Sequence, residues 1–343
     1  MTGLVSNKAL YEDIHQVIVD VRSPNEYREN HICGAINIPL FSDEERSHIG
    51  TTYKQKSTTE AKKLGMTYIS TRIEHIGHQL IELAEQFDRV VIYCQRGGMR
   101  SQSICDLMNA LDVQIYRLKG GMKGHRQFIS DHLGRLFEKK SFITLHGHTG
   151  VGKTRILESL KESGLDIINY EALAQNAGSV FGNILFSEEP PSQKYFEELV
   201  FHAIITAKSD YIFIESESKR VGTVLIPEIC MQQLEIGKHI LINTSVENRI
   251  KNLIDDYGEN RDHEDLITAI NKLRKRISNK KADELIDYVS KNQLSPIVNY
   301  LLVDYYDPMY QYSIDKYDYD HVIEYKDINE ASKVILDKYK KGI

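Results

Sequence analysis

The sequence predicts an α/β protein with two domains, each built on a parallel sheet. Its length supports two domains, because 343 residues exceed the roughly 100–200 that one ordinary domain contains. Short apolar runs alternate with helical patterns, which predicts parallel strands whose faces are covered by helices. This alternation occurs in two series, and a stretch with helical spacing, residues 125–140, separates them.

The apolar runs bounded by turn residues give the individual strands. We predict them at residues 15–21, 89–94 and 114–118 in the first series, and at 141–147, 166–170, 211–216 and 239–244 in the second. The separating stretch ends in basic residues, which suit the last turn of a connecting helix. We therefore expect domains at residues 1–137 and 138–343, with a helical insertion around 245–295.

Composition excludes several classes of protein. Hydrophobic residues make up 41% of the chain and charged residues 27%, which is typical of a globular protein. The N-terminus has no basic region followed by an apolar run, and no run of about 18 apolar residues occurs, so we expect a cytoplasmic protein without membrane contact. The net charge of −6 means that any nucleic-acid site must be a local basic patch.

A cysteine at the end of a buried strand is the first candidate for chemistry. In RVVIYCQRGGMRS, Cys94 ends the strand, a loop with two glycines follows, and a helix begins near Ser101. Gly97 and Gly98 can adopt backbone conformations closed to other residues, so that successive N–H groups turn toward the thiol. These donors and the start of the helix would lower the pKa of the thiol and hold anionic sulfur or selenium species.

Arg96 and Arg100 would add positive charge to the same pocket. The alternative is a buried, inert thiol, which is common for a lone cysteine, but the two glycines and two arginines favour reactivity. Cys105 lies on the apolar side of the next helix, so we expect it to be structural. The four cysteines form no close pair, and Cys33 and Cys230 have no activating neighbours in the sequence, so we assign these two no chemistry.

The sequence GHTGVGKT (147–154) is the second candidate, because it lies between a strand and a helix, as a phosphate-binding loop must. Backbone N–H groups along the loop can surround one phosphate, the Lys153 ammonium can reach a second, and the Thr154 hydroxyl suits a magnesium ion. A glycine-rich turn without a ligand is the alternative, and the full match to the motif disfavours it. The predicted phosphate-binding residues are Gly147, Gly150, Gly152, Lys153 and Thr154.

Two carboxylates follow a strand of the second series. Glu215 ends the strand YIFIE, and Glu217 would lie on the same side if the strand continued. They occupy the place of the acid that assists a phosphate loop, although an ordinary solvated strand end is nearly as compatible with the pattern. We treat Glu215 as a candidate ligand contact.

Two segments resemble the rhodanese homology domain, namely DVRSPNEYRENHICGAINIP (20–39) and YCQRGGMRS (93–101). In that family an Asp-Val-Arg segment and a His-Ile-x-Gly-Ala segment precede the catalytic cysteine loop, and Cys33 here replaces a usual proline. Residues 40–65 resemble instead the bacterial tRNA 2-selenouridine synthases, which fuse a rhodanese domain to a P-loop domain. Four later segments also resemble these enzymes, namely residues 170–182, 191–200, 214–227 and 305–317.

The resemblance implies a rhodanese-like α/β domain followed by a P-loop NTPase-like α/β domain with a helical C-terminal part. It implies a transferase that replaces the sulfur of 2-thiouridine at the wobble base of tRNA with selenium. In family terms, geranyl diphosphate first alkylates the sulfur, and selenium from selenophosphate then displaces the S-geranyl group. These two co-substrates and tRNA would be the ligands, with magnesium as an option and no redox cofactor. Cys94 would either carry or position selenium or attack the activated base carbon.

The sequence departs from the family pattern in two places. Gln95 follows the cysteine where tryptophan is usual, and Asn176 with Ala177 replaces a His-Arg pair. These changes remove an aromatic surface and two polar contacts, so efficiency or substrate preference can differ. Ser179 in the same glycine-rich segment and Lys194 after a double proline are candidate contacts to an anion or RNA, with a ligand-free loop and an ordinary helix cap as the alternatives.

The RNA-binding surface is only weakly indicated. Lys272, Lys275 and Arg276 recur at helical spacing, and Lys219 with Arg220 follows the two carboxylates. Solvated helix surface is the usual explanation of such runs, but Arg220 is a candidate RNA contact. Oligomeric state is not indicated by any of these patterns.

Two functions compete with the synthase interpretation. One is a nucleotide-binding regulatory protein whose rhodanese domain senses sulfur species, and the other is a plain thiosulfate sulfurtransferase. Each explains one domain, whereas the synthase interpretation uses both and accounts for residues 40–65.

Overall fold

The computed structural model describes residues 3–176, 189–257 and 263–339. The chain forms two compact units. The first comprises Met1–Gly134 and Glu197–Thr206, and the second comprises Arg135–Phe196 and Ala207–Ile343. Each unit contains one five-stranded sheet, and each is described by itself below.

The sheet of the first unit is entirely parallel and has the strand order β1-β5-β4-β2-β3. Its strands are β1 (Leu4–Val5), β2 (Gln16–Asp20), β3 (Ile36–Asn37), β4 (Arg89–Tyr93) and β5 (Ile115–Leu118). The three longer strands confirm the predicted apolar runs. The two-residue edge strands β1 and β3 were not predicted, because so few residues carry no periodicity.

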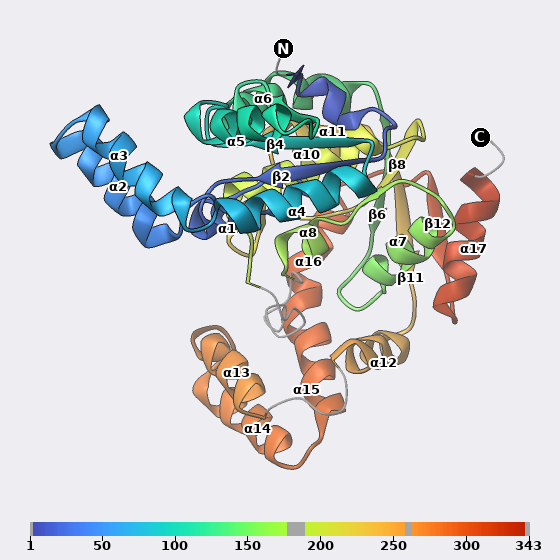
Figure 1. Cartoon of the computed structure of the whole chain (residues 1–343). Coiled ribbons are helices and arrows are strands. Elements are labelled where there is room, and N and C mark those ends of the chain that lie inside the picture. Colours follow the sequence, from blue (N-terminus) through green and yellow to red (C-terminus); the bar gives the residue numbers. More distant parts are fainter. Residues whose placement is uncertain (1–2, 177–188, 258–262, 340–343) are drawn as a thin grey trace. The chain divides into compact units, whose positions relative to one another are not determined.

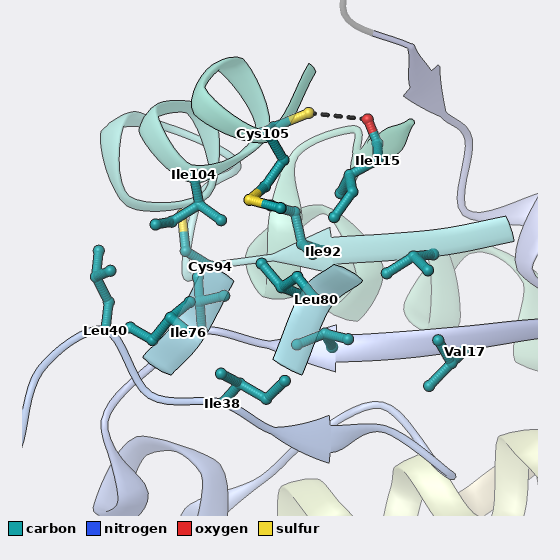
Figure 2. Packing of buried hydrophobic residues seen from close by; sticks show 14 of the residues in the cluster. Val17, Ile38, Leu40, Ile76, Leu80, Ile92, Cys94, Ile104, Cys105 and Ile115 are labelled. Atoms are coloured by element: carbon teal, nitrogen blue, oxygen red, sulfur yellow. Dashed lines mark hydrogen bonds between the residues drawn. The ribbon is translucent and has the colours of Figure 1, made fainter. Parts of the chain in front are cut away.

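Helices cover both faces of this sheet, as a parallel sheet requires. They are α1 (Pro24–Glu29), α4 (Ile73–Gln86), α5 (Met99–Ala110) and α6 (Gly121–Glu138), with a short 3₁₀ turn at Lys8–Tyr11. Figure 2 shows the core between strand β4 and the helices, where Leu80, Ile92 and Ile104 pack together with almost no exposed surface. The central strand therefore ends inside the unit, and the loop after it begins from a rigid position.

Residues 40–70 form a helical hairpin, α2 (Asp43–Gln55) and α3 (Thr58–Ser70), which extends away from the sheet of the first unit (Figure 1). Both helices start at a serine cap: Ser42 Oγ accepts from the backbone N–H of Glu45, and Ser57 caps α3 in the same way. Arg72 donates to both carboxylate oxygens of Glu45 at 2.7 and 3.1 Å. This bidentate pair fixes the base of the hairpin.

Helix α10 (Gln193–Thr206) contributes its last ten residues, Glu197–Thr206, to the first unit. Glu198 is completely buried there and lies 3.0 Å from Nε2 of the equally buried His125. The same carboxylate accepts the backbone N–H of Cys33 at 3.1 Å. The sequence did not predict this contribution, because it depends on contacts between residues far apart in the chain.

The sheet of the second unit is also parallel, with the strand order β12-β11-β6-β8-β7. Its strands are β6 (Ser141–His146), β7 (Ile167–Ile168), β8 (Tyr211–Glu215), β11 (Lys238–Asn243) and β12 (His321–Glu324), and a separate small hairpin joins β9 (Arg220–Val221) to β10 (Val224–Leu225). The mixed α/β class with parallel sheets is therefore confirmed.

Helices α7 (Lys153–Glu162), α8 (Tyr170–Ala174), α11 (Glu228–Ile236) and α17 (Ile328–Tyr339) accompany this sheet. Between β11 and β12 the described residues form α12 (Val246–Tyr257), α13 (His263–Ile277), α14 (Asn279–Ser290), α15 (Leu294–Tyr300), a π-helical stretch (Leu301–Tyr306) and α16 (Asp307–Ile314). Helices α13, α14 and α15 share a small core of their own around Ile270, Leu285 and Ile297. Within the described ranges, no helix is long and apolar enough to cross a membrane.

Candidate functional site

Cys94 lies directly after β4 and is buried at 4% exposure (Figure 2). Its Sγ is 3.3 Å from Oγ of Ser101. Burial raises the pKa of this thiol. The pKa is lowered by hydrogen bonds from the side chain and backbone of Ser101 and from the backbone of Arg96. The charge of Arg100 lowers it as well, and together these effects outweigh burial. The net pKa is below the ordinary value, so this thiol is the one that most readily forms a thiolate.

The loop around Cys94 is held by a second glycine pair that the sequence analysis missed. Gly97 has a φ of +64°, and a Cβ on Gly121, where φ is +55°, would lie 2.1 Å from the carbonyl oxygen of Cys94. The start of α6 can therefore approach the loop closely, and the N–H of Met122 donates to the Cys94 carbonyl at 3.0 Å. The recurrence of glycines in LKGGMKG is the signal that would have indicated this contact.

Gly98 differs from Gly97 in its backbone conformation. Its φ of −95° lies outside the left-handed region, and a Cβ there would meet no atom within 4 Å. Gly98 instead serves as the N-cap of α5, and its carbonyl accepts the Ser101 hydroxyl at 3.3 Å. The backbone turn toward the thiol therefore depends on Gly97.

The two arginines of the loop differ in their surroundings. Arg100 donates to both oxygens of Glu26 at 2.7 and 3.2 Å, so its position is fixed while part of its charge is neutralised. Arg96 is exposed at the mouth of the loop. The side chain of Arg96 is thus the more accessible of the two, and the charge of Arg100 contributes to lowering the pKa of Cys94.

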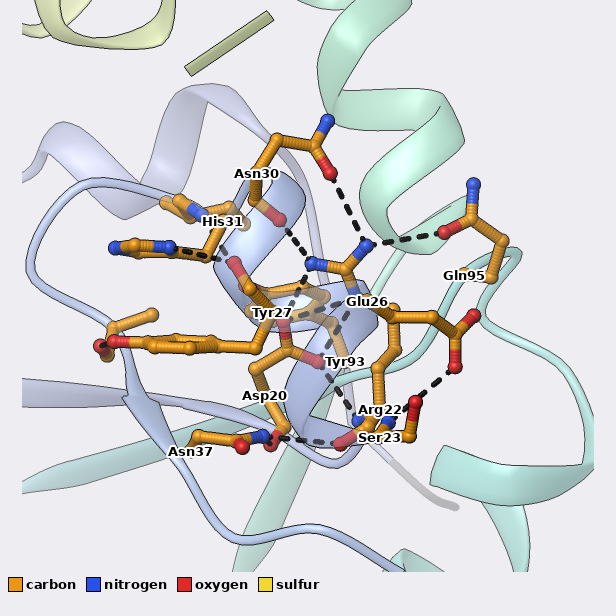
Figure 3. A network of polar contacts seen from close by, with 12 residues as sticks. Asp20, Arg22, Ser23, Glu26, Tyr27, Asn30, His31, Asn37, Tyr93 and Gln95 are labelled. Carbon is orange, nitrogen blue, oxygen red and sulfur yellow. Dashed lines mark hydrogen bonds and ion pairs between the residues drawn. The ribbon is translucent and has the colours of Figure 1, made fainter. Parts of the chain in front are cut away.

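A buried polar network lies beside the cysteine loop (Figure 3). Arg22 is 2% exposed, pairs with Asp20 at 2.6 Å, and donates to the Asn30 carbonyl. A further Nη1 donor of Arg22 reaches Oε1 of Gln95 at 3.2 Å. The residue that departs from the family pattern, Gln95, thus ties the cysteine loop to the Asp20–Arg22 pair through its amide group.

The other thiols are set apart from this chemistry. Cys105 is completely buried and donates to the Ile115 carbonyl at 3.0 Å, as Figure 2 shows. Cys230 is also completely buried. Burial, followed by the charge of Glu198, raises the pKa of Cys33 to about 11, which makes that thiol unreactive at neutral pH.

In the second unit, β6 leads into the loop 147–152, and α7 begins at Lys153. Gly147, Gly150 and Gly152 all have positive φ, and side chains there would collide with Ile242, Arg249 or Ile328. Lys153 Nζ donates to the Gly147 carbonyl at 3.1 Å, across the opening of the loop. The loop therefore has the left-handed glycine conformations expected of a phosphate-binding loop that precedes a helix N-terminus.

Residues from the helical insertion hold the phosphate loop from outside. Arg249, 4% exposed, donates to the Thr149 carbonyl at 2.8 Å and forms a bidentate pair with Asp307. Asn252 Nδ2 donates to the Gly150 carbonyl at 2.9 Å and contacts the Tyr325 hydroxyl at 3.0 Å. These supports were missed because they come from helices more than 90 residues away in the sequence.

Three carboxylates gather beside Thr154: those of Glu171, Glu215 and Glu217, whose closest oxygens all lie within 4.8 Å of one another. The Thr154 hydroxyl is 3.4 Å from both Glu171 and Glu215. Burial and the neighbouring carboxylates raise the pKa of Glu215 well above its ordinary value and that of Glu217 to about 8. A divalent cation would offset this repulsion, and the all-oxygen donor set fits magnesium. Glu171 was missed because only the fold brings it to this point.

The remaining candidates lie on other elements or outside the described residues. Lys194 is exposed in the first turn of α10, and Arg220 is exposed at the start of β9. Lys272 and Lys275 are exposed on α13, so both side chains are accessible to solvent. Ser179 and Ala177 fall outside the described residues.

Comparisons with known proteins match both units to families. Residues 140–341 match the family model described as the tRNA 2-selenouridine synthase AAA domain, and residues 6–127 match the rhodanese-like domain. The chain is 32% identical over 245 residues to the tRNA 2-selenouridine synthase of Nitrosomonas europaea, covering 70% of this chain and 63% of that protein. It is 31% identical over 330 residues to that of Hydrogenovibrio crunogenus, covering 87% and 89% respectively.

The chain thus spans less than two thirds of the length of the Nitrosomonas protein and most of the Hydrogenovibrio protein. Among solved structures, the N-terminal domain of a protein described as ATP/GTP binding from Clostridium difficile 630 is 42% identical. That match covers 37% of this chain and 98% of the other, with a TM-score of 0.36.

Proposed function

Because the chain belongs to the tRNA 2-selenouridine synthase family, we propose that it exchanges the sulfur of 2-thiouridine at the wobble base of tRNA for selenium. The observation that carries this proposal is the pairing, in one chain, of an activated thiol at Cys94 with a phosphate loop backed by carboxylates. Neither a plain sulfurtransferase nor a nucleotide sensor needs both. The cytoplasm, where tRNA is found, is the proposed location.

The first step we assign to the phosphate loop of the second unit. The thiocarbonyl sulfur forms a bond to the first carbon of geranyl diphosphate, and diphosphate leaves with the electrons of the broken carbon–oxygen bond. The loop N–H groups and Lys153 would stabilise the charge that develops on the leaving oxygen. This step converts a poor leaving group, the thiocarbonyl sulfur, into a thioether that can be displaced.

Magnesium fits the oxygen donors of Thr154, Glu171, Glu215 and Glu217, and these residues would hold it. When bound, the ion would supply positive charge to a diphosphate. Glu215 ends β8, which pairs with β6, and Thr154 lies in the first turn of α7 after the loop that follows β6.

The second step we assign to Cys94, acting as a nucleophile. Its thiolate adds to C2 of the alkylated base, and geranylthiol leaves after taking a proton from solvent. Selenium of selenophosphate then attacks the same carbon and expels the thiolate, and water cleaves the phosphorus–selenium bond to release phosphate. This order conserves electrons, whereas loading selenium onto the sulfur of Cys94 as a perselenide would need an oxidant.

Purified protein with thiolated tRNA, geranyl diphosphate, selenophosphate and magnesium, without nucleotide, should yield 2-selenouridine, detected by mass spectrometry of digested tRNA. Both donors are already activated, so added ATP should give no acceleration. Product that appears only with ATP, with proportional nucleotide consumption, would favour the nucleotide-driven alternative. Thiosulfate consumption with cyanide and no selenonucleoside would favour the plain sulfurtransferase.

A further inference from the structure

A cavity of about 1300 Å³ in the first unit lies between α1, the α2–α3 hairpin and the start of α5. It exceeds the roughly 300–1,000 Å³ of ordinary small-molecule sites, so it has room for a base together with a substituent. Its apolar lining includes Phe41, Ile49, Tyr53, Met66, Ile69 and Met99. We call it the hairpin cavity.

Large apolar side chains are exposed inside this cavity. Tyr53 is 56% exposed, Met66 is 69% exposed and Met99 is 64% exposed, while Phe41 beneath them is almost buried. Single exposed apolar residues are common, but several that line one hollow mark a binding site for an apolar group. Methionine side chains adapt their shape to such a ligand.

Charged groups surround this apolar lining. Arg96 and Arg100 line the cavity from the cysteine loop, and Lys54 and Lys62 line it from the hairpin. The carboxylate of Glu26, on the same wall, already pairs with Arg100 at 2.7 Å. Glu29, Asp43 and Asp106 line the cavity as well, so that with Arg46 five cations face four carboxylates. This small positive excess suits an anionic molecule that carries an apolar chain, such as a prenylated RNA.

We propose that the hairpin cavity holds the geranyl chain of S-geranylated tRNA while its base carbon faces the loop of Cys94. This inference rests on the proposed function and names the site of its second step. The base-attached chain fits better than free geranyl diphosphate, because Arg96 and Arg100, which closely follow Cys94 in the chain, line the cavity, and geranylthiol must leave at Cys94. The loop that suits a diphosphate belongs to the second unit.

The cavity also gives residues 40–70 a function. Most of the apolar lining comes from this segment, which the sequence analysis separated from ordinary rhodanese sequence. A sulfurtransferase that acts on small inorganic donors has no need for an apolar hollow of this size.

The test compares binding of two stem-loop RNAs that differ only in S-geranyl-2-thiouridine or 2-thiouridine at the wobble position. The wild-type chain should bind the geranylated RNA more tightly. The double variant Tyr53→Ser/Met66→Ser should lose about tenfold of that preference, which equals about 1.4 kcal/mol. Both residues are mostly exposed, so the variant should keep the melting temperature of the wild type. Leu111→Ser is the matched control, because Leu111, the C-cap residue of α5, is 62% exposed and is not among the residues that line the cavity.

Because RNA binding is measured without turnover, the experiment can refute the cavity assignment independently of the proposed function. A preference for geranylated RNA that is unchanged in the double variant would overturn the cavity assignment, even if the protein makes selenouridine. A preference that the double variant loses would support the cavity, even if selenation itself were absent. Slower geranylation of 2-thiouridine tRNA in the double variant, with unchanged binding of geranylated RNA, would place the free donor in the cavity and overturn the proposal.

Discussion

The Ser101 hydroxyl lies 3.3 Å from the sulfur of Cys94, within reach to donate to the sulfur once it is a thiolate. Because this bond favours the charged form, Ser101→Ala should raise the pKa of Cys94. The rate of Cys94 alkylation by iodoacetamide should then begin to rise at a higher pH, so that the variant reacts more slowly at pH 7. Ser103→Ala is the control, since Ser103 on the same helix only donates to the Arg100 carbonyl. Superimposable pH profiles would show that Ser101 does not activate the thiol.

Cys94 itself should be indispensable for selenation. Cys94→Ala should abolish 2-selenouridine formation from geranylated tRNA while the protein still folds, because the change removes only one sulfur atom from a buried site. Cys105→Ala should retain activity and lose about 1 kcal/mol of stability, because it opens a small cavity in the core. Nucleoside mass spectrometry and thermal denaturation give the two readouts. Wild-type selenation by Cys94→Ala would refute the nucleophile role.

Lys153 should matter for alkylation and not for selenation. Its ammonium would contact a diphosphate in both the bound donor and the leaving group, so Lys153→Ala should weaken donor binding and slow geranylation together. Supplying tRNA that is already geranylated should restore most of the selenation rate. Equal defects on both substrates would instead indicate that selenophosphate binds at this loop.

Asn252 should support the phosphate loop indirectly. Asn252→Ala removes the donor to the Gly150 carbonyl, so geranylation should fall about tenfold in kcat/KM through loss of loop order. Asn248→Ala is the matched control, because Asn248 lies on the same helix but contacts Thr244 and Lys326. Steady-state kinetics of geranylation measure kcat/KM for both variants. An equal loss of kcat/KM in each would mean that any change in helix α12 impairs the reaction.

Glu217 should link metal binding to pH. Its pKa of about 8 exceeds the ordinary value near 4.3, so the folded protein keeps a proton that the unfolded chain releases. Without magnesium, its contribution to the free energy of unfolding should therefore fall as pH rises from about 4.3 to 8. Magnesium displaces the proton, so its apparent affinity should rise with pH in the approach to pH 8.

Chemical denaturation at pH 6 and pH 8, with and without magnesium, measures this linkage. The stabilisation by magnesium should differ between pH 6 and pH 8 in the wild type. Glu217→Gln should remove most of this difference in the free energy of unfolding. The control Asp337→Asn, at an exposed position on α17, should leave it unchanged. A magnesium effect that is identical at both pH values would exclude Glu217 as a ligand.

The sequence by itself determined the fold class and both chemical motifs, because each is a local pattern. The apolar runs that became β2, β4, β6 and β8 carry their burial in consecutive residues. The glycines and lysine of residues 147–154 carry the backbone freedom and charge of a phosphate loop in one short segment.

Only the tertiary structure decided what surrounds those motifs. Gly121 reaches the Cys94 carbonyl, Glu171 joins Glu215, and Arg249 holds the phosphate loop through contacts between residues far apart in the sequence. No local pattern encodes such contacts, because they arise when helices pack on a sheet and bring distant side chains within hydrogen-bond distance. For the same reason the sequence did not predict the hairpin cavity, because its lining comes from α2, α3 and α5, which only the fold brings together.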